Sequence, residues 1–224
     1  MSNELEQQFE SSWDEYLQTL VKMVAIPSIS FPGYSKEPLI EHATFLFHTL
    51  KKIGMQTVEI LEIENENTFV PPYIFAEHLI SEEYPTVLLY AHYDVQPVGD
   101  ETLWHTPPFK ASIRTMQGME RMYGRGTADD KAGLLVHLAT IDTLLKQKKH
   151  LQVNIKVIFE GEEEVGSPNL EKFLKVHKEK LQADYMIVLD TVNLDTGIPS
   201  ITTSLRGVVV CEIEFHTLKN TLHS

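Results

Sequence analysis

Residue types that can ligate a metal occur in four short segments, each placed where a predicted strand or helix begins or ends. The segments are His92-Tyr93-Asp94, Asp129-Asp130, Glu160-Gly161-Glu162-Glu163-Glu164 and Asp190. In open α/β sheets, functional groups gather beyond the carboxyl ends of the strands. We therefore expect the four segments to converge on one edge of one sheet.

Metal binding is the chemistry that these residue types favour. Several carboxylates in one low-dielectric cleft cannot all stay ionised without cations, and histidine together with aspartate and glutamate suits zinc. Asp94 shares a face with His92 on an extended segment, so its carboxylate can accept a hydrogen bond from the outer ring nitrogen. The neighbours Glu163 and Glu164 should point in different directions. One of them can then ligate a metal while the other transfers protons.

Each segment taken alone has a simpler interpretation. Asp129 and Asp130 are typical of the start of a helix, where carboxylates favour the helix dipole. Residues 162–164 are typical of a solvated turn, and a histidine after a buried strand is more often structural than a ligand. Gly124-Arg125-Gly126 lacks the spacing of both common phosphate-binding loops. The metal-site hypothesis therefore depends on the segments occurring together.

Hydrophobic periodicity predicts the elements that would position these side chains. Helices are expected in residues 5–24, 38–53, 130–149 and 168–178. Strands are expected in residues 57–63, 73–79, 86–91, 153–159, 185–189 and 207–215. The runs 86–91 and 185–189 should be fully buried, whereas 207–215 alternates like a solvent-facing edge strand. Because strands alternate with helices, we predict an α/β fold with a mixed sheet flanked by helices.

Composition narrows the class of protein. The 224 residues are 42% hydrophobic and 23% charged, an ordinary globular balance, and the formal net charge is −13. This charge disfavours nucleic-acid binding. No apolar run approaches the ~18 residues that cross a bilayer, and the acidic N-terminus does not resemble a signal peptide. We expect a cytoplasmic protein without a membrane partner, in which the single cysteine, Cys211, is a small buried side chain.

The ordered motifs resemble those of the dinuclear zinc peptidases, the family of carnosinase-type dipeptidases, glutamate carboxypeptidase, acetylornithine deacetylase and succinyl-diaminopimelate desuccinylase. The resemblance covers roughly residues 10–224. Its motifs are Leu89-Tyr90-Ala91-His92-Tyr93-Asp94-Val95-Gln96-Pro97, Trp104 with Pro108-Phe109, Tyr123-Gly124-Arg125-Gly126-Thr127-Ala128-Asp129-Asp130-Lys131, Gly161-Glu162-Glu163-Glu164-Val165-Gly166-Ser167, Asp190, Pro199-Ser200-Ile201-Thr202 and Arg206-Gly207. Gln96-Pro97 and the Trp104 segment are most similar to the dipeptidase branch.

The resemblance implies two zinc ions, and it implies that each of the four segments contributes one side chain that ligates zinc. His92, Asp129 and Asp190 would hold one zinc. Asp129 would bridge to a second zinc, which Glu164 also ligates. The resemblance further implies a cis peptide bond after Asp129, a feature that is rare outside proline.

Three further side chains and a domain division follow from the same resemblance. Glu163 would be the general base that takes a proton from water, and Asp94 the hydrogen-bond partner of His92. His223 would belong to a lid and stabilise the oxyanion. Residues 1–205 would form the N-terminal part of the catalytic domain, and residues 206–224 the truncated start of a second α+β domain, of which only the first strand is present.

The function implied is zinc-dependent hydrolysis of a peptide bond, most closely that of a dipeptidase acting on small peptides, with a homodimer formed through the lid. Family members are commonly much longer, and the last ligand of their second zinc lies near the C-terminus. The chain is therefore expected to be a fragment whose second zinc site is incomplete. Two alternatives stay open: an N-acyl amino acid deacylase of the same family, and a catalytically inactive fragment that binds metal or dimerises.

Overall fold

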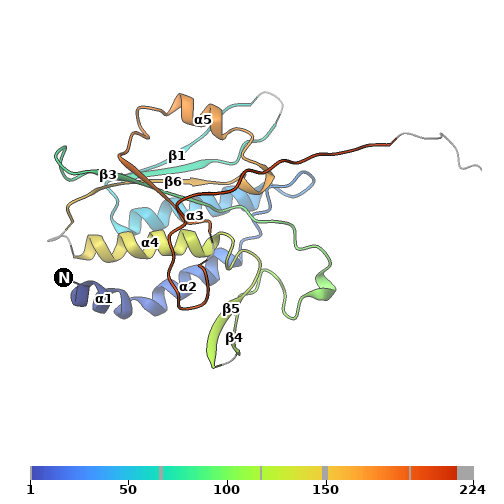
Figure 1. Ribbon diagram of the computed structural model, residues 1–224, viewed down its shortest axis with the longest axis horizontal. Coiled ribbons are helices and arrows are strands. Elements are labelled where there is room, and N and C mark those ends of the chain that lie inside the picture. Colours follow the sequence, from blue (N-terminus) through green and yellow to red (C-terminus); the bar gives the residue numbers. More distant parts are fainter. Residues whose placement is uncertain (1, 66–67, 117, 148–150, 192, 216–224) are drawn as a thin grey trace, which may run out of the picture. The chain divides into compact units, whose positions relative to one another are not determined.

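The computed structural model describes residues 2–65, 68–116, 118–147, 151–191 and 193–215. Its contacts divide the chain into two units, Met1–Asp190 and Thr191–Ser224. Every helix and strand found in the described residues lies in the first unit. The fold that positions the candidate site is therefore the fold of that unit (Figure 1).

A five-stranded mixed sheet forms the centre of the first unit, in the order β1-β2-β6-β3-β7. Its strands are β1 (Thr57–Leu61), β2 (Tyr73–His78), β3 (Thr86–His92), β6 (Asn154–Glu160) and β7 (Tyr185–Val188). β1, β2 and β6 pair antiparallel, whereas β6, β3 and β7 are parallel to one another. The register places His92 opposite Glu160. The carboxyl ends of the three parallel strands therefore lie at one edge of the sheet.

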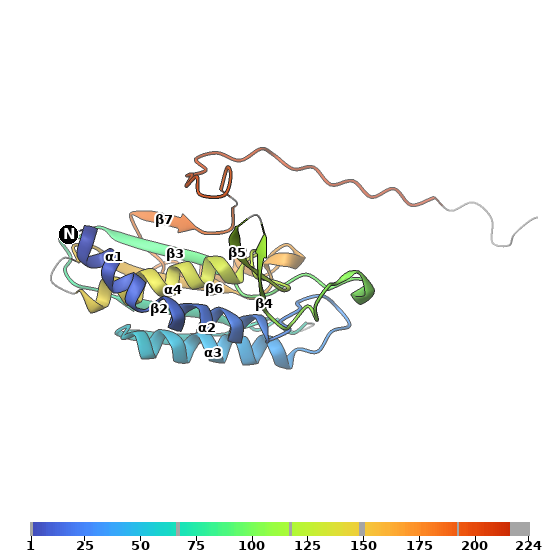
Figure 2. The same cartoon turned by 90° about the horizontal axis from the view of Figure 1, so that it is seen from below.

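Helices cover both faces of this sheet (Figures 1 and 2). One face carries α1 (Ser2–Ser11), α2 (Trp13–Val24), α3 (Glu37–Ile53) and α4 (Lys131–Lys146), and the other carries α5 (Leu170–Val176). The side chains of β2 alternate accordingly. Ile74 packs in the core shared with α2, α3 and α4, whereas Tyr73 packs in the second core and stacks on Phe173 of α5. The predicted mixed sheet flanked by helices is confirmed.

Two local features differ from the predictions. The helix expected in residues 5–24 is split into α1 and α2 because Ser12 leaves the helical conformation, with φ −104° and ψ 1°. The long loop expected after β3 contains a short 3₁₀ helix (Glu101–Leu103) and a hairpin of β4 (Ser112–Met116) and β5 (Met119–Tyr123). The hairpin strands are largely exposed and carry charged residues, so no apolar run marks them in the sequence.

Strand β7 was predicted to be buried, and this prediction is wrong. The side chains of Tyr185, Met186, Ile187 and Val188 are 46–65% exposed. β7 is an edge strand whose neighbour in the sheet is β3. An apolar run predicts a strand, but whether the side chains of that strand are buried depends on which elements pack against it.

The second unit also corrects two expectations. Residues 207–215 were predicted to be the first strand of a second domain, but they form no strand in the described part of the chain. Cys211 was predicted to be buried and is exposed. Both differences have one cause: among the described residues of this unit, no strand lies beside 207–215 to pair with it. The catalytic candidate His223 lies outside the described residues.

The membrane prediction can be compared with the helices. Within the described ranges, none of the helices is both long enough and apolar enough to cross a bilayer.

A buried histidine in α4 predicts how the stability of the fold depends on pH. His137 is 3% exposed, and its Nε2 donates a hydrogen bond to the backbone oxygen of Tyr90 at 2.9 Å. Burial lowers the pKa of His137 to about 4, although this hydrogen bond opposes the shift. Between about pH 6.5 and pH 4 the unfolded chain binds the extra proton, so stability falls as the pH falls, by up to about 1.4 kcal/mol per pH unit.

We expect the His137→Gln variant to lose this part of the pH dependence, because glutamine does not titrate. Urea unfolding of both proteins at several pH values between 4 and 7 measures the difference. Equal slopes for His137→Gln and the unchanged protein would contradict the assignment.

Candidate metal centre

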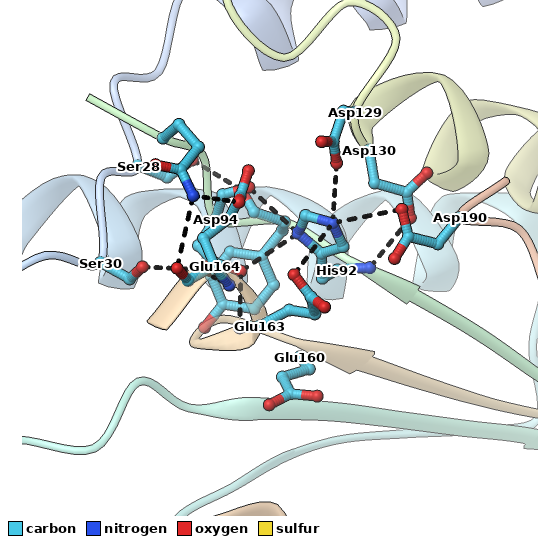
Figure 3. A network of polar contacts seen from close by, with 12 residues as sticks. Ser28, Ser30, His92, Asp94, Asp129, Asp130, Glu160, Glu163, Glu164 and Asp190 are labelled. Carbon is cyan, nitrogen blue, oxygen red and sulfur yellow. Dashed lines mark hydrogen bonds and ion pairs between the residues drawn. The ribbon is translucent and has the colours of Figure 1, made fainter. Parts of the chain in front are cut away.

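The four predicted segments meet at the carboxyl edge of the sheet (Figure 3). β3 ends at His92, β6 leads into the 3₁₀ turn Glu163–Val165, and α4 begins directly after Asp129-Asp130. Asp190 follows the end of β7 by two residues. The side chains brought together are His92, Asp94, Asp129, Asp130, Glu163, Glu164 and Asp190.

His92 lies at the centre of this group, and its side chain is fully buried. Its Nε2 is 3.1 Å from Asp129 Oδ1, 3.7 Å from Asp190 Oδ1 and 3.9 Å from Glu163 Oε2. Burial by itself lowers the pKa of His92, but the nearby carboxylates of Asp190 and Asp94 outweigh it and raise the pKa to about 11. The surrounding carboxylates thus favour a positive charge at Nε2. A proton and a divalent cation compete for that position.

Asp94 connects the histidine to the turn after β6. Its Oδ1 lies 3.2 Å from His92 Nδ1, as predicted, and also accepts the backbone N–H of Glu163 at 3.1 Å. Its Oδ2 accepts the backbone N–H of Glu164 at 3.1 Å and the hydroxyl of Ser30 at 2.6 Å. The contacts beyond His92 were not predicted, because a backbone N–H group leaves no signature in the sequence.

Three carboxylates of the group, those of Asp130, Glu163 and Glu164, have a raised pKa and so hold their protons more tightly. Burial raises the pKa of Asp130 to about 8, with His92 opposing the shift and Asp190 adding to it. Burial also raises the pKa of Glu163 and Glu164, and neighbouring carboxylates add to both shifts. A bound divalent cation would compensate this concentration of negative charge. One imidazole among carboxylate oxygens is a donor set that fits such a cation.

Among the residues that the structure describes, two groups of three His, Asp or Glu side chains have ligand atoms within 4.8 Å of one another. The first is His92 with Asp129 and Glu164, and the second is His92 with Asp130 and Asp190. Sequence reasoning noted Asp130 only as part of a carboxylate pair. It is 2% exposed, and its Oδ2 accepts the backbone N–H of His92 at 3.1 Å. The peptide bond between Asp129 and Asp130 is cis, as the resemblance implied.

A glycine in the first turn of α4 allows the site to close. A Cβ atom at Gly133 would lie 2.1 Å from Asp130 Oδ1 and 2.1 Å from the backbone oxygen of Leu189. Leu189 directly precedes Asp190. Gly133 therefore permits the close approach that places Asp130 and Asp190 on the same side of His92.

Gln96 is a further residue whose place in the site the sequence did not reveal. The sequence indicates Gln96 only as part of a motif shared with the dipeptidase branch. In the structure its Nε2 donates a hydrogen bond to Glu164 Oε2 at 2.6 Å. This hydrogen bond opposes the rise in the pKa of Glu164 and favours its ionised form. A glutamine two residues after Asp94 carries no metal-ligand signal of its own, so only the fold brings it to the carboxylate.

Comparison with known proteins is consistent with this geometry. Residues 88–221 match the profile of peptidase family M20/M25/M40. The chain is 32% identical over 217 residues to Cys-Gly metallodipeptidase dug1 of Schizosaccharomyces pombe, covering 94% of the chain and 45% of that protein. It is 30% identical over 221 residues to Beta-Ala-His dipeptidase of Homo sapiens, covering 94% and 43%. The chain thus spans less than half the length of these relatives.

A solved structure shares the fold. The crystal structure of human carnosine dipeptidase 1 superposes with a TM-score of 0.77 at 29% identity, over 86% of this chain and 42% of that one. The fold matches that of the catalytic domain of such dipeptidases, and the described residues include candidate metal-ligand groups. The chain belongs to peptidase family M20/M25/M40, and membership implies metal binding.

Proposed function

We propose that this chain forms the metal-binding part of a zinc-dependent dipeptidase. His92, Asp129 and Asp190 would hold one zinc ion, and Asp129 and Glu164 a second. The observation that carries the proposal is the fully buried imidazole of His92, whose Nε2 faces carboxylates from three separate segments. We propose Asp129 rather than Asp130 as the ligand, because Asp129 Oδ1 lies 3.1 Å from His92 Nε2, whereas Asp130 Oδ2 accepts the backbone N–H of His92.

The reaction proposed is hydrolysis of a peptide bond. Bound zinc ions would polarise the scissile carbonyl and make water more acidic. Glu163 accepts the proton of the attacking water at its carboxylate and then delivers it to the nitrogen of the leaving amine. Its raised pKa favours the first transfer, because a carboxylate of very low pKa would be a poor acceptor of the proton from water. Asp94 accepts the Nδ1–H of His92 and so keeps Nε2 available as the ligand atom.

The relatives suggest the substrate class and the wider organisation. Two are named for the dipeptides Cys-Gly and Beta-Ala-His, and we propose a small dipeptide as substrate here. We further propose that residues 1–205 belong to the catalytic domain, that residues 206–224 begin a lid through which the protein dimerises, and that it acts in the cytoplasm. Dipeptide hydrolysis by a protein of the relatives' full length tests the activity. Turnover of acyl amino acids but not of dipeptides would favour the deacylase instead.

Metal retention tests the site itself. The purified chain is expected to retain zinc after mild dialysis, and His92→Ala to bind it at least about tenfold more weakly, because one of few protein ligands is lost. Elemental analysis and isothermal titration with zinc measure this. The exposed His48 serves as a control, since His48→Ala should retain zinc like the unchanged chain. Equal retention by His92→Ala and the unchanged chain would overturn the proposed site.

A further inference from the structure

The segment that follows α2 runs alongside the segment that follows β3. Ile29 and Val95 form an isolated parallel bridge, and the backbone N–H of Val95 donates to the backbone oxygen of Ser28 at 3.0 Å. Ser28 and Ser30 lie on either side of Ile29. Both hydroxyls point to the same target, the segment that contains His92 and Asp94 (Figure 3).

The two serines hold different parts of that segment. Ser28 is fully buried, donates to the backbone oxygen of Tyr93 at 2.6 Å and lies 3.1 Å from His42 Nδ1. Ser30 donates to the side chain of Asp94 at 2.6 Å. Ser28 therefore fixes the backbone, whereas Ser30 acts on the carboxylate itself.

The Asp94 carboxylate has little freedom to find another partner. An ionised carboxylate offers about four lone-pair directions, two on each oxygen. Oδ1 is shared by His92 Nδ1 and the Glu163 N–H, and Oδ2 by the Glu164 N–H and the Ser30 hydroxyl. Asp94 is fully buried, so water does not substitute readily for a lost donor. Among these four contacts, the one to Ser30 is the shortest.

We infer that Ser30 is a positioning residue: by fixing the rotation of the Asp94 carboxylate, it sets both the His92 ring and the turn that carries Glu163 and Glu164. One hydroxyl from the N-terminal part of the chain thereby aligns groups contributed by two different strand ends. The inference deepens the proposed function and rests on it for the role of those groups. The contacts themselves do not depend on a metal.

Hydrogen exchange tests the inference on the metal-free chain. In Ser30→Ala, the amides of Glu163 and Glu164 should exchange about tenfold faster, because their acceptor can rotate away. The amide of Tyr93 donates instead to the backbone oxygen of Glu160 at 2.7 Å and should keep its exchange rate. Ser30→Thr, which retains the hydroxyl, should restore the slow exchange. NMR-detected exchange resolves all three amides.

Cobalt(II) gives a second readout of the same alignment. Its absorption spectrum reports ligand geometry, and Ser30→Ala should shift the visible bands and weaken cobalt binding about fivefold or more. The exposed Ser35, which bonds to Glu37, provides a matched serine-to-alanine control that should change neither quantity. Ser28→Ala distinguishes the loss of a hydrogen bond to the backbone from the loss of one to the Asp94 carboxylate. It should lower the midpoint of urea unfolding more than Ser30→Ala does.

The outcomes separate the inference from the proposed function. Faster exchange at Glu163 and Glu164 with no cobalt binding by any variant would uphold the role of Ser30 and overturn the metal proposal. Unchanged exchange at these amides in Ser30→Ala would overturn the inference, whatever the metal result. Uniformly faster exchange that includes Tyr93 would also overturn it, since Ser30 would then only stabilise the fold.

Discussion

Glu163→Gln in a protein of the relatives' full length is expected to retain its metal and to lose about 10²–10⁴-fold in kcat. The amide matches the carboxylate in shape but cannot accept a proton from water. Glu163 is also the most distant of the three carboxylates facing His92 Nε2, at 3.9 Å, which suits proton transfer better than ligation. Steady-state hydrolysis of a dipeptide, with metal content measured on the same sample, checks both parts.

Glu164→Gln is the matched variant, because it makes the same change one residue later. Glu164 shares a cluster of ligand atoms with His92 and Asp129, so this variant should bind metal more weakly. Its activity should then recover partly when metal is added in excess, whereas that of Glu163→Gln should not. If both variants behave alike in both assays, the division of roles between the two glutamates is wrong.

Gly133→Ala is expected to weaken zinc binding about tenfold or more and to destabilise the chain by about 1–3 kcal/mol through overpacking. The added Cβ would meet Asp130 Oδ1 and the backbone oxygen of Leu189, each at 2.1 Å. A backbone oxygen cannot rotate aside as a flexible side chain can, so the relief must move Asp190 or α4. Zinc titration and urea unfolding measure the two effects.

The sign of the Gly133 effect on stability is informative. Alanine is favoured over glycine inside a helix by about 1 kcal/mol, so without these contacts the substitution would stabilise α4. Gly207→Ala is the control, because a Cβ there meets nothing within 4 Å. It should leave zinc binding and stability unchanged. A Gly133→Ala protein that is more stable than the original would show that the approach of α4 to Leu189 is looser than the structure has it.

Elements whose apolar faces are buried could be predicted from the sequence almost to the residue. The strand expected in residues 86–91 is Thr86–His92, and the helix expected in 38–53 is Glu37–Ile53, ended by Gly54 in the left-handed conformation. The exposure of β7 could not be predicted, because it depends on which neighbours the strand has. The hairpin of β4 and β5 escaped for the related reason that its exposed strands have no apolar run.

The sequence predicts that the site residues lie close together, but it does not predict which of them pair or hydrogen-bond with one another. Parallel strands end at a common edge, so His92, Glu163 and Asp190 could be expected to meet. The pairing of Asp130 with His92 and Asp190, and the contacts of Asp94 with two backbone amides, depend on local turns. A sequence identifies which side chains can ligate a metal. Which oxygen accepts a given backbone N–H becomes known only from the three-dimensional structure.

The position of Asp190 links metal supply to the integrity of the sheet. Asp190 lies two residues after β7, an exposed edge strand whose partner in the sheet is β3, the strand that ends at His92. A metal ion bound by both His92 and Asp190 would cross-link the ends of these two strands, which are far apart in the sequence. The free energy of unfolding would then rise with the logarithm of the free-metal concentration. Removing the metal with a chelator would then lower the free energy of unfolding, and β7 would be the first strand to separate from the sheet.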